Sequence, residues 1–243
     1  SVKSEEKRLW FSIVVPPKKG VASDSPGFLW QAKLRLFTKP PIWGTALANI
    51  QLQDLDWNRV RSEAAGGNPE AAYLLAHKLM KSNQLHARAA YWLDRAAALG
   101  HGPAENDLGI LAMFGLGVTR DVSRAAELFE RAASKGVAMG HLNIGLCRLV
   151  GVGCRRSTIL ARTHIKRAAA KKLPVAEVIL AVNYAVGTQV VLRDFEKAYE
   201  LVLLARAHGS DWPLEDDSSR NFYYVGIDEL DGYLERLISN SKL

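Results

Sequence analysis

The stretch from residue 104 to residue 136, AENDLGILAMFGLGVTRDVSRAAELFERAASKG, sets the architecture of this chain. Ala104, Leu108 and Ala112 recur at the spacing of one face of an α-helix. A Gly-Leu-Gly-Val segment follows at 115–118, and glycine accepts the left-handed backbone conformation at which many helices end. The stretch therefore begins with one helix and then turns sharply.

A second helix is predicted after this turn. Asp121 is suited to its N-cap, where a carboxylate accepts hydrogen bonds from free backbone N–H groups, and Gly136 ends it. Its apolar stripe consists of Ala125, Leu128, Ala132 and Ala133. One such hairpin cannot bury its apolar face alone, so copies of it must stack on one another.

Copies of this hairpin recur at a period of 36 residues. Ala104, Gly140 and Ala176 are spaced by this interval, and so are Gly100 and Gly136. We delimit four repeats, at residues 71–103, 104–139, 140–175 and 176–210. The first of them is short in its loop.

The pattern resembles the Sel1-like repeat, a relative of the tetratricopeptide repeat. That unit has a small residue, Leu-Gly, Tyr, Gly-x-Gly-Val, Asp, Lys-Ala, an aromatic residue, Lys-Ala-Ala and Gly. Residues 104–136 match most of it, with Arg124-Ala125, Leu128 and Arg131-Ala132-Ala133 in the later places. The resemblance covers roughly residues 70–210. It implies an all-α fold, a right-handed α-solenoid of stacked helix-turn-helix repeats.

The flanks of the array follow other patterns. Residues 1–45 form an N-terminal arm that is irregular or β-like, because residues 9–15 and 30–36 are β-prone or alternate in polarity. These two runs either pair as a ribbon or lie along the solenoid, and residues 28–37 could instead form a short helix. Residues 46–69 are interpreted as a degenerate capping hairpin. Residues 211–243 are interpreted as an acidic loop and a C-terminal capping helix.

Charge is unevenly distributed along the chain, whose formal net charge is +7. From Arg131 to Ala176 there are ten Lys or Arg residues and no acid, whereas residues 211–236 carry eight acids and two arginines. This distribution indicates an acidic partner; the alternative is that the charges only solvate helix faces. The basic patch consists of Arg155, Arg156, Arg162, Lys166, Arg167, Lys171 and Lys172.

The first helix of each stacked hairpin is expected to line an inner, concave wall. The residues expected on this wall are Tyr73, His77, Met80, Asn106, Ile110, Met113, Leu142, Leu146, Leu149, Val178 and Val182. The set is largely apolar, and a contiguous exposed apolar surface indicates an interaction site. We expect a segment of another protein to bind in this groove. The alternative is that the chain's own N-terminal arm covers it.

No catalytic motif is recognisable in the sequence. None of the six histidines belongs to an H-E-x-x-H motif, and no serine lies in G-x-S-x-G. The glycines at 115 and 117 lack the third glycine and the Lys-Ser/Thr of a phosphate loop, and they recur at 151 and 153 as a repeat turn. We therefore expect a protein that is not an enzyme, with no cofactor, no metal and no small-molecule substrate.

Two cysteines leave two alternatives open. Cys147 is expected late in one helix, and Cys154 follows the next turn, so that a disulfide between them is geometrically conceivable. Such a bond would favour a periplasmic or extracellular setting. The alternative is a pair of thiols. The cysteines of cysteine-rich Sel1-like proteins usually link the paired helices of every repeat, and this chain departs from that pattern.

The compartment is inferred from the ends of the sequence. No apolar run reaches the ~18 residues of a membrane helix. Ser1 is interpreted as the start of a processed chain, as in a bacterial secretory or lipoprotein precursor. We therefore expect a periplasmic protein, with membrane association through a processed or lipidated N-terminus as one option.

These observations predict a non-enzymatic scaffold that binds a partner protein. The resemblance implies narrower roles, because small bacterial Sel1-like proteins include envelope regulators and immunity proteins that neutralise phospholipases delivered by type VI secretion. An envelope adaptor in assembly or signalling is the first alternative. A basic module that binds an anionic polymer or a membrane surface is the second. Nucleic acid is disfavoured, because the basic patch lacks the aromatic residues on which bases stack.

Overall fold

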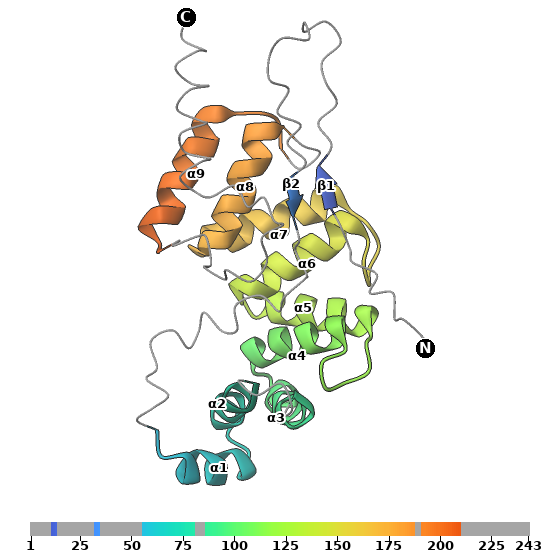
Figure 1. The fold of residues 1–243 in the computed structure, drawn as a ribbon, viewed down its shortest axis with the longest axis vertical. Coiled ribbons are helices and arrows are strands. Elements are labelled where there is room, and N and C mark those ends of the chain that lie inside the picture. The colour runs from blue at the N-terminus through green and yellow to red at the C-terminus, as the bar shows by residue number, and fades with distance from the viewer. Residues whose placement is uncertain (1–10, 14–31, 35–54, 81–85, 188–190, 210–243) are drawn as a thin grey trace, which may run out of the picture.

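The computed structural model describes residues 11–13, 32–34, 55–80, 86–187 and 191–209. Within these ranges the chain forms nine helices stacked one after another along the long axis of the molecule (Figure 1). The helices are α1 (Trp57–Ala65), α2 (Pro69–Met80), α3 (His86–Ala98), α4 (Gly102–Phe114), α5 (Val122–Ser134), α6 (Ala138–Val150), α7 (Thr158–Ala170), α8 (Pro174–Val186) and α9 (Phe195–Ala207). The predicted all-α solenoid is confirmed.

Helices α2 to α9 form four consecutive hairpins. Each first helix packs most extensively on the second helix of its own hairpin, and each second helix packs on the first helix of the next hairpin. Contacts thus run between neighbours along the chain, as in a solenoid whose core is continuous from repeat to repeat. Helix α1 packs on α2 and buries Val60 and Ala64 against the first hairpin.

The predicted helix ends of the second hairpin are confirmed. Helix α4 ends at Phe114, and Gly115 follows in the left-handed conformation with φ 72°. The side chain of Asp121 accepts hydrogen bonds from the backbone N–H groups of Ser123 and Arg124 at the start of α5. The sequence pattern therefore located both ends of this loop correctly.

The second glycine of each Gly-x-Gly loop fits against the preceding hairpin. A Cβ atom at Gly153 would lie 1.9 Å from the carbonyl oxygen of Val122, and one at Gly117 would lie 2.3 Å from the carbonyl carbon of His86. Each loop therefore contacts the first residue of the preceding second helix. Only glycine allows this approach, and it sets the distance between successive hairpins.

The core consists of three clusters along the stack. The first lies mainly among α1 to α4, the second among α4, α5 and α6, and the third among α6 to α9. Alanine and glycine are frequent at the contacts, so the helices approach closely. Helices α4, α5 and α6 each contribute to two clusters, so they lie at the centre of the array.

Two short strands precede the helices. Phe11–Ile13 (β1) pairs antiparallel with Ala32–Leu34 (β2), with Phe11 opposite Leu34 and Ile13 opposite Ala32. Of the alternatives weighed from the sequence, these two segments adopt the ribbon. The rest of the expected arm, the first part of the capping hairpin at 46–54 and the acidic loop and capping helix at 211–243 lie outside the described residues.

Candidate partner-binding surfaces

The residues expected on the inner wall are mostly buried. Eight of the eleven belong to this group: Tyr73, His77, Met80, Asn106, Ile110, Met113, Leu142 and Leu146. The other three, Leu149, Val178 and Val182, are partly exposed and pack against the third core cluster. The structure thus corrects the expectation of a largely exposed apolar wall. Whether these residues contact a partner stays a prediction.

The close packing of the first helices explains this burial. Eleven of the thirteen residues of α4 are buried, so that this helix has almost no solvent face. Ile110 and Met113 belong to the second core cluster, where they share the space between repeats with Ile144. Amphipathic spacing assigns one packed face to a helix, but a helix at the centre of a curved stack packs on several sides.

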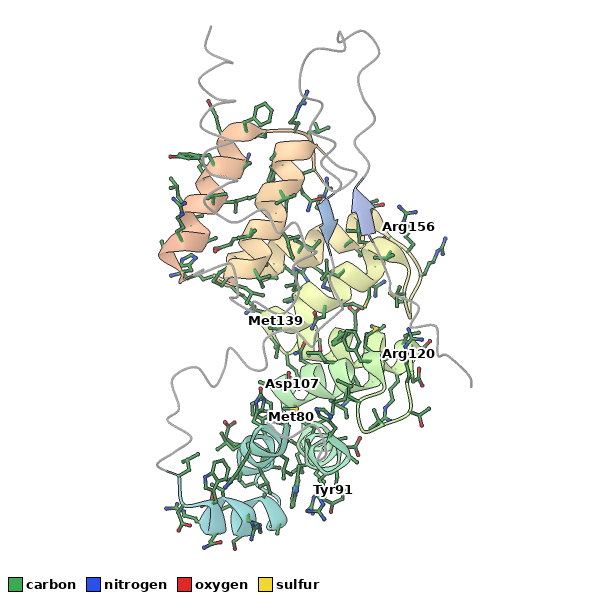
Figure 2. The ribbon with its side chains drawn as sticks, viewed as in Figure 1. Met80, Tyr91, Asp107, Arg120, Met139 and Arg156 are labelled. Atoms are coloured by element: carbon green, nitrogen blue, oxygen red, sulfur yellow. The ribbon has the colours of Figure 1, made fainter. Side chains whose placement is uncertain are left out.

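A chain of buried polar side chains joins the first helices of three repeats. His77 Nε2 lies 2.8 Å from Asp107 Oδ2, and Asn106 Nδ2 donates to Asp107 Oδ1 at 3.0 Å. Asn143 Nδ2 donates to Asn106 Oδ1 at 2.9 Å. Figure 2 labels Asp107 beside Met80, where α2 and α4 meet. Buried polar groups that all have partners fix the relative position of the helices that carry them.

Tyr73 belongs to the same network. Burial, and then the charge and hydrogen bond of Asp107, raise the pKa of Tyr73, so its hydroxyl stays protonated. Its ring contacts the ring of His77 edge-on at a centroid distance of 4.5 Å. Asp107 and Asn143 escaped sequence-based prediction, although both are the sixth residue of their helix, which alignment of the repeats reveals. This network is structural, because its members bond to one another.

The basic patch is divided between the two edges of the stack. Arg155 and Arg156 lie in the loop before α7, whereas Lys171 and Lys172 follow its last turn. A helix of thirteen residues is about 20 Å long, so these two groups lie far apart. Arg162, Lys166 and Arg167 are exposed along α7 between them. The seven cations therefore follow one helix rather than forming a compact cluster.

Arg156 has a structural contact that recurs in the preceding repeat. Its Nε donates to the carbonyl oxygen of Leu149 at 3.1 Å, and Arg120 Nε donates to that of Met113 at 3.1 Å. Both arginines thus satisfy a carbonyl at the end of a first helix, where intrahelical partners run out. Figure 2 shows Arg120 and Arg156 on the same edge of the stack, opposite Met139 at the start of α6.

The opposite edge carries buried carboxylates. The side chain of Glu105 is fully buried near the start of α4, and its Oε1 lies 2.5 Å from Arg131 Nη2 and 2.8 Å from Lys135 Nζ. Neither oxygen of Glu105 meets hydrogen-bond geometry, so charge rather than directed bonding holds it. In the fourth repeat, Glu177 Oε1 lies 2.8 Å from His208 Nδ1. In these two repeats the pairs join the start of the first helix to the end of the second helix.

Cys147 and Cys154 are free thiols. Burial raises the pKa of Cys147 to about 12 and also raises the pKa of Cys154. Of the two alternatives left open by the sequence, this structure has the reduced pair. Among the described residues, no group of three or more His, Cys, Asp or Glu side chains could hold a metal ion. No helix in the described part of the chain is long and apolar enough to cross a membrane.

Comparison with known proteins agrees with this architecture. The Sel1 repeat model matches residues 69–101, 102–137, 138–173 and 174–210. No curated protein matches the chain significantly. Among solved structures, the chain is similar to a protective antigen of uropathogenic Escherichia coli strains that displays an SLR fold. The identity is 26% and the TM-score 0.58, over 65% of this chain and 34% of that one.

A Sel1 repeat protein from Oxalobacter formigenes has the same fold, with 20% identity and a TM-score of 0.58. That match covers 67% of this chain and 63% of the other, so this chain spans less than two thirds of either protein. The family repeats begin two residues before those we delimited from the sequence, at the first residues of α2, α4, α6 and α8. With four consecutive repeats over residues 69–210, the chain belongs to the Sel1 repeat family.

Proposed function

We propose that this chain is a protein-binding scaffold without catalytic activity, whose partner is acidic. Sel1 repeat proteins generally act as scaffolds for protein–protein interaction. The observation that carries the proposal is the surface of the third repeat, where α7 exposes Arg162, Lys166 and Arg167 within a segment of the chain that contains no acid. Such a surface attracts an acidic partner and accelerates its binding.

The eleven residues expected on the inner wall, called the inner row below, contribute a second contact with the partner in this proposal. Its accessible members, Leu149, Val178 and Val182, lie on α6 and α8. They are partly exposed apolar side chains, which a partner segment can cover. The buried members of the row pack in the core and fix the positions of the first helices.

The test compares the two surfaces in a pull-down of the copurifying partner at two salt concentrations. Val178→Asp with Val182→Asp probes the inner row, and Arg162→Gln with Lys166→Gln probes α7. These positions are suitable because they are at least partly exposed, whereas aspartate at Ile110 or Leu146 would enter the core. We expect each pair to weaken capture while circular dichroism stays unchanged. Unaltered capture by both variants would refute the proposal.

Salt separates this proposal from a basic module for an anionic polymer or membrane surface. Polyanion binding depends steeply on salt and is insensitive to apolar substitutions. If capture of lipid vesicles or polyanion collapses between low and physiological salt, while the Val178 and Val182 substitutions have no effect on any ligand, the polymer function is favoured instead.

A narrower form of the proposal is a periplasmic immunity protein that neutralises a secreted phospholipase effector. It is supported by the Sel1 repeat array and by the cationic surface suited to an acidic toxin. The test is co-expression with the product of the neighbouring gene, directed to the periplasm, and cell fractionation to locate the chain. Failure of the chain to rescue growth from that toxicity would leave an envelope adaptor in assembly or signalling as the remaining form.

A further inference from the structure

The third repeat lacks the buried carboxylate of its neighbours. The fourth residue of the first helix is Glu105 in the second repeat and Glu177 in the fourth, but it is His141 in the third. Each glutamate contacts basic side chains at the end of the second helix of its own repeat, Arg131 and Lys135 for Glu105 and His208 for Glu177. The third repeat therefore has a histidine where the two repeats that flank it have an anion, whereas the first repeat has Ala72 at this position.

The third repeat retains the two cations that hold the buried carboxylate in the second repeat. Arg167 and Lys171 occupy the places at the end of α7 that Arg131 and Lys135 occupy at the end of α5. The ammonium group of Lys171 lies over Gly136, as that of Lys135 lies over Gly100 one repeat earlier. Arg167 and Lys171 are exposed, and neither forms an ion pair with a carboxylate within the described ranges.

His141 does not supply the missing negative charge. Its Nδ1 lies 3.1 Å from Nδ1 of His164, and both rings are buried. Among the described residues, the acid that contacts this pair is Glu130, which lies 3.8 Å from His164 Nε2 and is already paired with Arg148 at 2.6 Å. Burial, the neighbouring histidine and the cations Arg167 and Lys171 lower the pKa of His141, and burial lowers that of His164. The environment thus disfavours a further positive charge.

The third repeat also has a lysine at a position where the backbone conformation favours glycine. Lys172 has φ 58°, the left-handed conformation, at the position where the other three repeats have Gly100, Gly136 and Gly209. A residue with a side chain is disfavoured in this conformation, and glycine is the usual choice after a helix end. The third repeat thus gains a cation at the same edge where it loses an anion.

We propose that Arg167 and Lys171, with Lys172 and His141 beside them, bind an aspartate or glutamate side chain of the partner protein. The partner's carboxylate contacts these two exposed cations, which are equivalent to the pair that holds Glu105 in the second repeat. This inference rests on the scaffold function proposed above and specifies the chemistry of its partner. It also assigns the contact to the edge where α6 begins, next to Met139 in Figure 2.

The second repeat indicates a carboxylate rather than a nucleic acid as ligand. There the same pair of cations holds a carboxylate in the fold itself, with N–O distances of 2.5 and 2.8 Å. Nucleic-acid sites add exposed aromatic side chains for stacking. None of the exposed large apolar side chains on α7 is aromatic, since they are Ile159 and Leu160.

The test uses the full chain and a capped hexaglutamate peptide at constant ionic strength, with binding followed by NMR. We expect Arg167→Gln with Lys171→Gln to weaken binding at least about tenfold, because two charge-assisted contacts are lost. Arg88→Gln with Arg155→Gln removes the same charge at exposed positions outside the site and should weaken it less than about threefold. His141→Glu should abolish binding by filling the site internally. The ring signals of His141 and His164 should shift only where the site is intact.

Several results would overturn the inference. Equal weakening by both double variants would show that the overall positive charge attracts the peptide and that Arg167 and Lys171 form no specific site. Tighter binding of a hexathymidine oligonucleotide with the same dependence on Arg167 and Lys171 would assign the site to nucleic acid. Binding only after neutralisation of Asp211, Glu215, Asp216 and Asp217 would identify the chain's own acidic segment as the ligand. If hexaglutamate ignores the site while partner capture still needs α7 and the inner row, the inference falls and the scaffold function stands.

Discussion

The second and third repeats have the same backbone structure and differ in a few side chains. Both have thirteen-residue helices, a Gly-x-Gly loop against the preceding hairpin and an arginine on the last carbonyls of the first helix. The second repeat adds an internal anion, Glu105, and an apolar Leu128. The third has His141 and His164 at those positions, and Lys172 in place of a glycine.

This difference separates the residues that build the array from those that give one repeat its own chemistry. Small residues, loop glycines and caps recur, because every hairpin must meet its neighbours in the same way. The polar residues near the helix ends contact side chains of their own repeat, so they can differ from one repeat to the next. Substitutions at equivalent positions therefore compare the two repeats directly.

The largest effect is expected from the core residue of each second helix. Phe129 fits against Gly109, and Ile165 fits against Gly145, at equivalent places. Phe129→Ala should lower the free energy of unfolding by about 4 kcal/mol and Ile165→Ala by about 3 kcal/mol, because the larger side chain leaves the larger cavity. Urea denaturation measures both. A larger loss for Ile165→Ala would show that the third repeat has the more rigid core.

The loop glycines should be equally sensitive in the two repeats. Gly117→Ala and Gly153→Ala should each cost about 3 kcal/mol, since a positive φ and a clash with the preceding helix act together. Gly67→Ala is the matched control, because Gly67 has φ 94° but open space around its Cβ position, and it should cost only about 1 kcal/mol. Equal losses at all three sites would mean that backbone conformation alone matters.

Exchange of the charged residue at the fourth position should change stability in opposite directions. Glu105→Gln should cost about 2 kcal/mol, because Arg131 and Lys135 lose their buried carboxylate. His141→Glu should gain about 1 kcal/mol by supplying Arg167 and Lys171 with one. Thermal unfolding at pH 7.5 tests the pair. A loss of stability in both variants would contradict the equivalence of the two positions.

The position two residues after each second helix tests the conformational cost of Lys172. Lys172→Gly should stabilise the chain by about 1 kcal/mol, and Gly136→Ala should destabilise it by about the same amount. Chemical denaturation of both variants gives the comparison. No gain from Lys172→Gly would indicate that contacts of the lysine offset its strained backbone.

The smallest effect is expected from pH. Because the native environment lowers the pKa of His141 and His164 below 6.5, the unfolded chain takes up protons first as the pH falls. Their contribution to stability is therefore complete above pH 6.5 and declines as the pH falls below it. His164→Leu, which copies Leu128 of the second repeat, should flatten the dependence of the unfolding free energy between pH 7.5 and 5.5. An unchanged slope would exclude the pair as its source.

The repeat pattern predicted the elements better than the surfaces. Spacing of small and apolar residues, loop glycines and Asp121 located the helices of the second hairpin and their ends. The same spacing placed Ile110 and Met113 on an exposed wall, whereas they pack between repeats. Periodicity along one helix carries no information about how many neighbours surround it, which depends on the curvature of the whole stack.

By itself, the sequence determined that helical hairpins of constant length stack into an array, because local turn chemistry and a 36-residue period suffice for that. Only the tertiary structure decided which residues meet. It buried eight of the eleven residues expected on the inner wall, divided the basic patch between two edges and brought His141 to His164 with Arg167 and Lys171 close by. Such contacts join helices through space, so their charges and burial follow from packing rather than from position in the chain.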